Sequence, residues 1–260
     1  MEKFDNLIKK LERSELKKEE LEKCLSRLSK HFEIDIDIET LNFLGLPIRE
    51  EADCIFLTTK KNHFKDEEYC VVDIETNGNS PIKNQIIELG AVKIKNGKIT
   101  AKFESYVFAD FIPPAITKIT KIKKEDLKDA PSLKKVLQDF KLFLGDNVFV
   151  AHNVKFDYNF ISNSLKVVGL EELLNRKLCT VDLSRKTINS PRHGLAFLRD
   201  FLKIEEGDHH RAYSDAHSAS IVLQECFKNI PENINTTEDL IYFSKMNNKQ
   251  KNKKPTASFD

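Results

Sequence analysis

The order of short apolar segments after residue 68 constrains the fold more than any other feature of the chain. Apolar or alternating runs come first and predict strands. They include EYCVVDIE and the runs QIIELGAVKI and KITAKFESYVF, which meet at Asn96-Gly97, a dipeptide typical of hairpin turns. Pro113-Pro114 breaks this pattern, and helical spacings then alternate with one more strand candidate, NVFVAHN. This order predicts an α/β domain with a mixed sheet flanked by helices.

The expected helices of this domain lie beyond Pro114 and carry apolar residues on one face. They cover residues 124–127, 132–144, 154–168, 193–202 and 211–227. Gly169 follows the third of them, as glycine commonly does where a helix ends.

The first 65 residues follow a different pattern and form a separate small, α-rich module in our interpretation. Apolar residues recur at helical spacing over residues 4–11 and 21–28, and later apolar stretches allow a terminal hairpin. A winged-helix-like module that binds nucleic acid or protein is one interpretation, and an extension packed on the next domain is the other. The polar run KKNHFKDEE marks the boundary. We therefore expect a module at 1–65, the α/β domain at 66–232, and a polar, lysine-rich tail at 233–260 that is disordered at its end.

Composition and charge argue against several classes of protein. The net charge is only +1, so no global basic field marks a nucleic-acid-binding protein, although a neutral total can contain a local basic patch. The five cysteines include no C-x-x-C pair, which fits a reducing compartment better than a disulfide framework. The N-terminus lacks the apolar core of a signal peptide, and no apolar run is long enough to span a bilayer. We expect a cytoplasmic protein that does not bind membranes.

The tetrapeptide DIET occurs twice, and its two copies predict different roles. In the second copy, Asp73 and Glu75 follow Val71-Val72, so both carboxylates share one face at the end of a buried strand. Carboxylates held close together there need a cation or raised pKa values. In the first copy, Asp37 and Glu39 alternate with isoleucines, as in an amphipathic edge strand or the entry to a helix. We expect this first pair to face water.

Two later segments supply partners for the second pair. In AHNVKFD, Asn153 is placed to cap a helix, and Asp157 lies in the first turn of that helix. In HHRAYSDAHSA, His210 precedes Asp215 by five residues, a spacing that would leave the side chains about 140° apart on one helix. The two side chains converge if His210 lies on a loop before the helix, and Gly207-Asp208 favour such a loop.

The set formed by Asp73-x-Glu75, Asp157 within HNVKFD, and Asp215 preceded by His210 resembles the DEDD superfamily of 3′–5′ exonucleases. It is similar to the branch in which the general base is histidine. Within that branch, the chain resembles the proofreading epsilon subunit of bacterial DNA polymerase III and its relatives. The motifs stand in the family's order over roughly residues 67–230. The resemblance implies a ribonuclease H-like sheet, an exonuclease domain at 66–232, and the DNA polymerase III catalytic subunit as a partner.

The resemblance also implies how the site works. Two divalent ions about 3.5–4 Å apart, Mg²⁺ or Mn²⁺, would assist hydrolysis of a phosphodiester, and such hard cations prefer oxygen ligands. Asp73 would bridge both ions, Glu75 and Asp215 would complete the first ion's shell, and Asp157 would hold the second ion. His210 would accept the proton of the attacking water.

The substrate implied by the resemblance is the single-stranded or frayed 3′ end of a nucleic acid, with DNA favoured. Contacts to the terminal nucleotide are implied for Thr76, Asn77 and Asn153. Two alternatives stay open at this point. An RNA-trimming exonuclease of the same fold would differ in its contacts to the 2′-hydroxyl group, and an adaptor would use the fold for binding without catalysis.

Several other titratable side chains stand near these motifs and are interpreted without a catalytic role. His152 is expected to be structural, His193 to be an exposed residue at the start of a helix, and His217 to face away from Asp215. Asp182 is expected to be structural or to support the ligands indirectly. His209 neighbours the proposed base, but the five-residue offset favours His210.

Overall fold

A mixed five-stranded sheet forms the centre of the computed structural model, which describes residues 2–32, 36–204 and 210–246. Its strands are β4 (Tyr69–Thr76), β5 (Ile86–Lys95), β6 (Lys98–Tyr106), β7 (Val148–Ala151) and β8 (Lys177–Cys179). The strand order is β6-β5-β4-β7-β8. β4, β5 and β6 run antiparallel, whereas β4, β7 and β8 run parallel. The predicted α/β class with a mixed sheet is confirmed.

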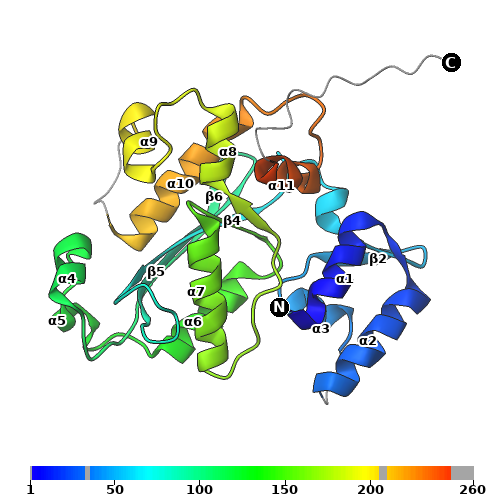
Figure 1. The fold of residues 1–260 in the computed structure, drawn as a ribbon, viewed down its shortest axis with the longest axis horizontal. Coiled ribbons are helices and arrows are strands. Elements are labelled where there is room, and N and C mark those ends of the chain that lie inside the picture. The colour runs from blue at the N-terminus through cyan, green and yellow to red at the C-terminus, as the bar shows by residue number, and fades with distance from the viewer. Residues whose placement is uncertain (1, 33–35, 205–209, 247–260) are drawn as a thin grey trace.

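Helices cover both faces of this sheet (Figure 1). On one face lie α6 (Leu133–Leu144) and α7 (Val154–Val167). On the other lie α8 (Thr180–Thr187), α9 (Leu195–Phe201), α10 (Ala212–Phe227) and α11 (Thr237–Lys245). Because side chains alternate along a strand, Val72 and Ile74 enter the first core while Val71 enters the second. The face that receives Val71 also receives Asp73 and Glu75.

The N-terminal residues build a second, smaller core. Its elements are α1 (Glu2–Arg13), β1 (Leu16–Lys17), α2 (Lys18–Phe32), α3 (Ile38–Phe43), β2 (Ile48–Glu51), β3 (Cys54–Leu57) and the 3₁₀ turn η1 (Thr58–Lys60). The strands form an antiparallel sheet in the order β1-β3-β2. The core contains Leu11, Leu41 and Ile55 from this region and Leu174 from the α/β domain. Figure 1 shows these helices, coloured blue, to one side of the central sheet.

Polar contacts connect the N-terminal part with the α/β domain at the segment where the sequence predicts only a domain boundary. The Phe64 amide donates to the Asn235 carbonyl at 3.0 Å, and the Thr237 amide donates to Asn62 at the same distance. The buried Arg176 forms ion pairs with Glu12 of α1, at 2.7 Å, and with Glu238 of α11. The division at residues 65–66 therefore stays a prediction about domains, while the segment itself is anchored to α11.

The first DIET copy enters a helix. Asp37 caps α3, and its Oδ1 accepts hydrogen bonds from the Thr40 amide and hydroxyl, both at 2.7 Å. Asp37 and Glu39 are exposed, as expected. Ile34 and Asp35, which open the same stretch, lie outside the described residues.

Four elements beyond residue 66 were missed from sequence. α4 (Pro114–Thr120) begins at the proline pair, where the sequence predicts only an interruption of the strand pattern. Proline is well suited to the first turn of a helix. β8 and α8 are short and adjoin directly. α11 occupies part of the expected polar tail, where Leu240 and Ile241 are buried and Thr236 forms a capping box with Asp239. The disorder expected at the end of the tail concerns residues 247–260, which lie outside the described residues.

None of the helices described here is both long enough and apolar enough to cross a membrane.

The close approach of α10 to β5 depends on a glycine. A Cβ atom at Gly90 would lie 2.1 Å from the backbone nitrogen of Tyr213 and 2.3 Å from the carbonyl carbon of Ala212. The obstructing atoms are backbone, so a side chain cannot fit unless α10 moves away from the sheet. Gly90 also pairs directly with Asp73 across the β4–β5 ladder.

Replacing Gly90 by serine is therefore expected to destabilise the fold by about 1–3 kcal/mol, the usual cost of overpacking. Thermal or urea unfolding measures this loss. Gly194→Ser is the matched control, because nothing lies within 4 Å of a Cβ there and Gly194 is the N-cap of α9, a position that serine suits. Equal stability of the two variants would contradict the role assigned to Gly90.

Candidate active site

Asp73 and Glu75 lie near the carboxyl end of β4, beyond the point where β7 stops pairing with this strand. β7 pairs with β4 only through Val71, whereas β5 continues alongside and places Gly90 opposite Asp73 and Glu88 opposite Glu75. A register shift follows between Glu75 and Thr76. The end of β4 is thus open on the β7 side, whereas on the β5 side Glu88 stands opposite Glu75.

Asp157 reaches the same place from the start of α7, which follows β7 directly. Its side chain is only 4% exposed. Burial raises the pKa of Asp157 to about 7, although hydrogen bonds from its own amide and from the Ile74 amide lower this pKa. The contact with Ile74 connects α7 to the open end of β4.

Asn153 occupies the N-cap position of α7, but its side chain makes no capping hydrogen bond. Its backbone is left-handed, with φ 84° and ψ 56°, a conformation that asparagine tolerates better than most residues. The expected capping by this side chain is therefore wrong. The turn itself depends on the backbone conformation of Asn153.

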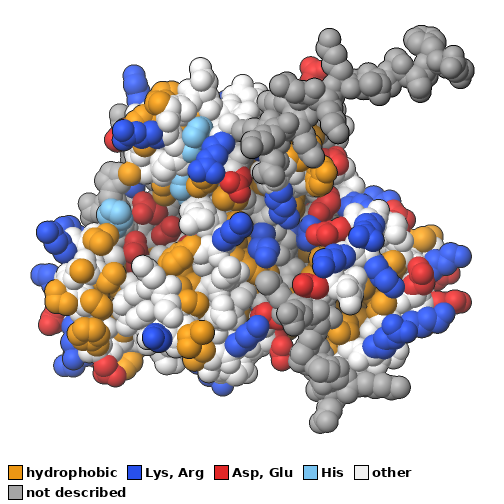
Figure 2. All heavy atoms as spheres, viewed as in Figure 1, with side chains coloured by type: hydrophobic (Ala, Val, Ile, Leu, Met, Phe, Trp, Pro, Cys, Tyr) orange, Lys and Arg blue, Asp and Glu red, His pale blue; other side chains and the backbone are white. Residues whose placement is uncertain are grey.

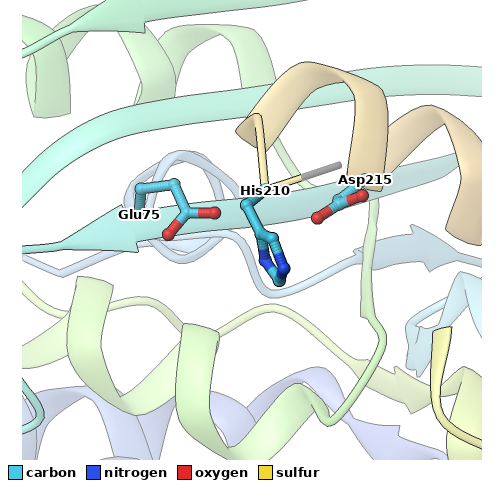
Figure 3. A group of neighbouring side chains, drawn as sticks. All are labelled: Glu75, His210 and Asp215. Atoms are coloured by element: carbon cyan, nitrogen blue, oxygen red, sulfur yellow. The ribbon is translucent and has the colours of Figure 1, made fainter. Parts of the chain in front are cut away.

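Glu75, His210 and Asp215 converge from β4 and from the N-terminal end of α10 (Figure 3). One ligand atom from each of the three residues lies within 4.8 Å of the others. His210 precedes α10 and has a left-handed backbone, φ 61°, so its ring can turn toward Asp215. The predicted position of His210 before the helix is confirmed. Gly207, Asp208 and His209 lie outside the described residues.

Two arginines stabilise this end of α10. Arg211 donates to both carboxylate oxygens of the buried Glu88, at distances of 2.8–3.4 Å, and Glu88 also accepts the Ala212 amide at 3.1 Å. Glu88 thereby anchors the first turn of α10 to β5. Arg199 of α9, itself 4% exposed, donates to Asp215 Oδ1 at 3.0 Å. The helix that carries Asp215 is held from two sides.

The electrostatics of the site are dominated by crowded acids. Burial raises the pKa of Glu75 to about 8, with further contributions from Asp215, Glu88 and Asp157, while the Arg211 guanidinium lowers it. Burial, followed by the charges of Asp157, Asp215 and Glu75, raises the pKa of Asp73 well above its ordinary range. A bound cation would relieve this repulsion.

The donor set fits a hard divalent cation. Carboxylate oxygens are the ligands that Mg²⁺ and Mn²⁺ prefer, and burial together with the charges of neighbouring acids raises the pKa of Asp73 and Glu75. In Figure 2, acidic side chains gather in a hollow beside a histidine, at the edge of the molecule where α10 begins. The arrangement suits binding a metal ion together with a phosphate group.

Thr76 and Asn77 shape the turn that follows β4. The Thr76 hydroxyl donates to the Gly78 carbonyl at 2.9 Å. The Asn77 side chain accepts from the Gln85 amide at 2.8 Å and donates to the Phe111 carbonyl at 3.1 Å. Both side chains are therefore engaged in holding the loop, and their contact with a nucleotide stays a prediction.

His152, His193 and His217 have structural surroundings. The ring of His152 lies 2.9 Å from the Thr180 hydroxyl and 2.9 Å from the His193 carbonyl, and burial lowers its pKa to about 4. His193 contacts the Ser184 hydroxyl at 3.1 Å. The His217 ring stacks on Tyr213, with 6.3 Å between centroids.

Sequence reasoning missed Glu88, Arg199 and Arg211. Glu88 had a detectable signal, because it interrupts the apolar run QIIELGAV, and a buried carboxylate in a strand needs a partner. Arg199 had none, since an arginine on an amphipathic helix is ordinary. Asp182 forms an ion pair with Arg185 at 3.5 Å on the same helix.

The raised pKa values predict how the stability of the metal-free protein depends on pH. Unfolded carboxyl groups titrate near pH 4, whereas those of Asp157 and Glu75 titrate at about 7 and about 8 in the folded chain. Between these limits the folded state binds more protons, so the free energy of unfolding falls as pH rises from about 5 to 8. Thermal unfolding in chelator at several pH values measures this fall.

The variant Asp157→Asn removes one such group and is expected to reduce the fall in stability over that interval. Asp37→Asn is the matched control, because hydrogen bonds from Thr40 lower the pKa of Asp37 and place its titration below the interval. Identical pH profiles for Asp157→Asn and the parent protein would contradict the assignment.

Comparison with known proteins identifies the family. The family model described as "Exonuclease" matches residues 70–223. The DNA polymerase III PolC-type protein of Staphylococcus aureus (strain bovine RF122 / ET3-1) is 40% identical over 162 residues, which are 61% of this chain and 11% of that protein. The PolC-type protein of Halalkalibacterium halodurans is 38% identical over 186 residues, 70% of this chain and 12% of that protein. The chain thus spans about a ninth of the length of these relatives.

Solved structures share the fold at lower identity. Exonuclease X, in complex with 5′-overhanging duplex DNA, matches with a TM-score of 0.55 and 23% identity, over 68% of this chain and 99% of that one. Exonuclease I of E. coli, in a zinc-bound complex with single-stranded DNA, matches with a TM-score of 0.58 and 16% identity. The match covers 64% of this chain and 42% of that one. The family match, the mixed sheet and the converging acids agree with the resemblance to DEDD exonucleases, and the chain belongs to the exonuclease family.

Proposed function

We propose that this protein is a metal-dependent 3′–5′ exonuclease that removes nucleoside 5′-monophosphates from the 3′ end of DNA. The observation that carries the proposal is the convergence of Glu75, His210 and Asp215. Asp73 lies close to this group, because burial and then the charges of Asp157, Asp215 and Glu75 raise its pKa. These are the five residues at which the sequence matches the motifs of the superfamily.

In this proposal four carboxylates hold two divalent ions, which activate water and neutralise phosphate charge when bound. Asp73 is central, because burial and then the charges of Asp157, Asp215 and Glu75 raise its pKa. Glu75 and Asp215 form one part of the site and Asp157 the other. The ion pair of Arg199 with Asp215 Oδ1 orients that carboxylate.

His210 is the proposed general base. It stands before α10, exposed to solvent, with a ring nitrogen near the oxygens of Glu75 and Asp215. Histidine is the side chain that most often takes up a proton in general acid–base catalysis. The oxygen of the attacking water would bond to phosphorus while the 3′-oxygen of the preceding nucleotide leaves and takes up a proton from solvent. The phosphate would stay on the 5′-oxygen of the released nucleotide.

DNA is the proposed substrate, and proofreading beside the catalytic subunit of a DNA polymerase III is the proposed role. Support comes from the similarity to PolC-type DNA polymerase III proteins and from the fold shared with two nucleases solved with DNA. This role would place the protein in the cytoplasm, where bacterial replication occurs. Thr76, Asn77 and Asn153 surround the end of β4 and the start of α7, and we propose that this region meets the terminal nucleotide.

Replacing a proposed ligand is expected to remove hydrolysis without unfolding the protein. Asp73→Ala should lower the rate by at least about a hundredfold, because changes even to residues that only support metal ligands cost 10–100-fold. Digestion of a 5′-labelled single strand with Mg²⁺ or Mn²⁺ measures the rate. Thermal unfolding should show the variant to be at least as stable as the parent in chelator, since a repelled charge is removed.

Asp37→Ala is the control for this experiment, because Asp37 stands in the same tetrapeptide but caps α3. It should leave the rate unchanged apart from a small loss of stability. Full activity of Asp73→Ala, or loss of activity in Asp37→Ala, would contradict the proposed site.

The same assay distinguishes DNA from RNA as substrate. The proposal predicts faster shortening of a DNA strand than of an RNA strand of the same sequence, and efficient removal of a mismatched 3′ nucleotide from a duplex. Faster digestion of RNA would contradict the proofreading role while leaving the hydrolytic site intact.

A further inference from the structure

Three neighbouring surface hollows connect the nuclease domain with the N-terminal helices. The first lies between α7, α8 and α11, the second between α11 and the end of α1, and the third between α1 and α2, with volumes of about 540, 540 and 490 Å³. Lys245 lines both the first and the second, and Arg13 lines both the second and the third. The hollows therefore adjoin one another along the surface, and together we call them the basic trough.

The first hollow includes the start of the helix that carries Asp157. Lys155 stands on the first turn of α7, two residues before Asp157, and lines this hollow with Arg185 and Lys186 of α8. The single acid in its lining is Asp182, which is paired with Arg185. The trough thus begins with an excess of positive charge on the helix that brings Asp157 to the site.

The third hollow is the most basic part of the trough. Its charged lining residues are Lys9, Lys10, Arg13 and Arg27, without an acid among them. Within the described part of the chain, no carboxylate lies within ion-pairing distance of these four side chains, which are all exposed. Positive charge that no carboxylate compensates, on a chain with a net charge of only +1, attracts a polyanion.

The second hollow joins the two basic ends and differs in character. Its buried Arg176 is neutralised by Glu12 and Glu238. Tyr242 on its wall is 67% exposed, although its neighbour on the same helix, Ile241, is buried. A large exposed ring between two groups of cations offers a surface on which a base can stack. Figure 2 shows Lys and Arg side chains recurring from the centre of this face to the helices α1 and α2.

We propose that the basic trough binds the single-stranded DNA upstream of the 3′ end that occupies the active site. This inference rests on the proposed function and extends it by giving residues 1–32 a role in holding the substrate. The cations at both ends contact phosphates, and Tyr242 stacks with a base between them. Because phosphates and stacked bases occur in every sequence, the trough binds strands without sequence preference.

The chemistry of the trough favours a nucleic-acid strand over an acidic protein segment. Its cations are spread along a path, as the charges of a strand are, and an exposed aromatic ring lies among them. The path also leads to the only acidic cluster with metal-ligand spacing found among the described residues. A strand whose 3′ end lies at that cluster must leave along the surface, and Lys155 is the first cation on the way to the N-terminal helices.

The test compares substrates that do and do not reach the third hollow. The variant carries Lys9→Gln, Lys10→Gln and Arg27→Gln in the full chain, with Lys95→Gln, Lys98→Gln and Lys134→Gln as a matched control of equal charge change on exposed positions outside the trough. Fluorescence anisotropy in chelator measures affinity for a single strand of about 40 nucleotides at several salt concentrations. Hydrolysis of a strand of about four nucleotides, too short to reach beyond the first hollow, measures the active site alone.

The proposal predicts an affinity for the long strand that is about tenfold weaker in the trough variant, and a slope of log affinity against log salt reduced by about 2, because three phosphate contacts are lost at about 0.7 each. The control variant should bind like the parent, and all three proteins should cut the short strand at the same rate. Equal affinities of the parent and the trough variant, or an equal loss in the control, would overturn the proposal.

Tyr242→Ala supplies an independent readout. Loss of stacking is expected to weaken binding of the long strand at least about fivefold, with an unchanged salt slope, because stacking releases no counterions. Unchanged affinity would overturn the role of the ring. The anisotropy measurements do not depend on catalysis. Absence of hydrolysis on every substrate would therefore contradict the proposed function, while the affinities would still test the role of the trough.

Discussion

Repulsion among carboxylates is the physical constraint around which this structure is organised. Asp73, Glu75, Asp157 and Asp215 come from three separate elements. Burial raises the pKa of Asp73, Glu75 and Asp157, and the charges of neighbouring acids raise the pKa of Asp73 and Glu75 further. Such an arrangement costs free energy in the absence of a cation. The sheet and helices therefore have to hold the acids together, and the packing near the site shows how they do so.

Contacts on both sides of α10 hold this helix in place. Gly90 lets the helix approach β5 to backbone contact, Glu88 accepts the amide of Ala212 and pairs with Arg211, and Arg199 binds Asp215. None of these residues supplies a ligand in the proposed mechanism. Their effect is to fix the orientation of His210 and Asp215 before any metal or substrate arrives, which is how a rigid scaffold preorganises a site.

The sequence, through the motifs of the superfamily, indicated the proposed ligands better than the residues that hold them in place. Asp73 and Glu75 share one face because side chains alternate along a strand, and Asp157 and Asp215 lie in the first turns of helices whose starts have local sequence signals. Such signals are contained in a few consecutive residues. The contact of Arg199 with Asp215 depends on how two helices cross, which no local pattern records. Likewise, α11 was missed because its few apolar residues become meaningful only against the core that they cover.

The most direct test of the account is calorimetric titration of the metal-free protein with Mn²⁺ at pH 7, repeated in buffers that differ in ionisation enthalpy. The difference between buffers counts the protons released for each ion bound. Because the carboxyls of Asp157 and Glu75 carry protons near neutral pH when no metal is bound, the account predicts proton release on binding. Binding without proton release, or with Asp73→Ala binding as tightly as the parent, would contradict the central claim that these crowded acids form the metal site.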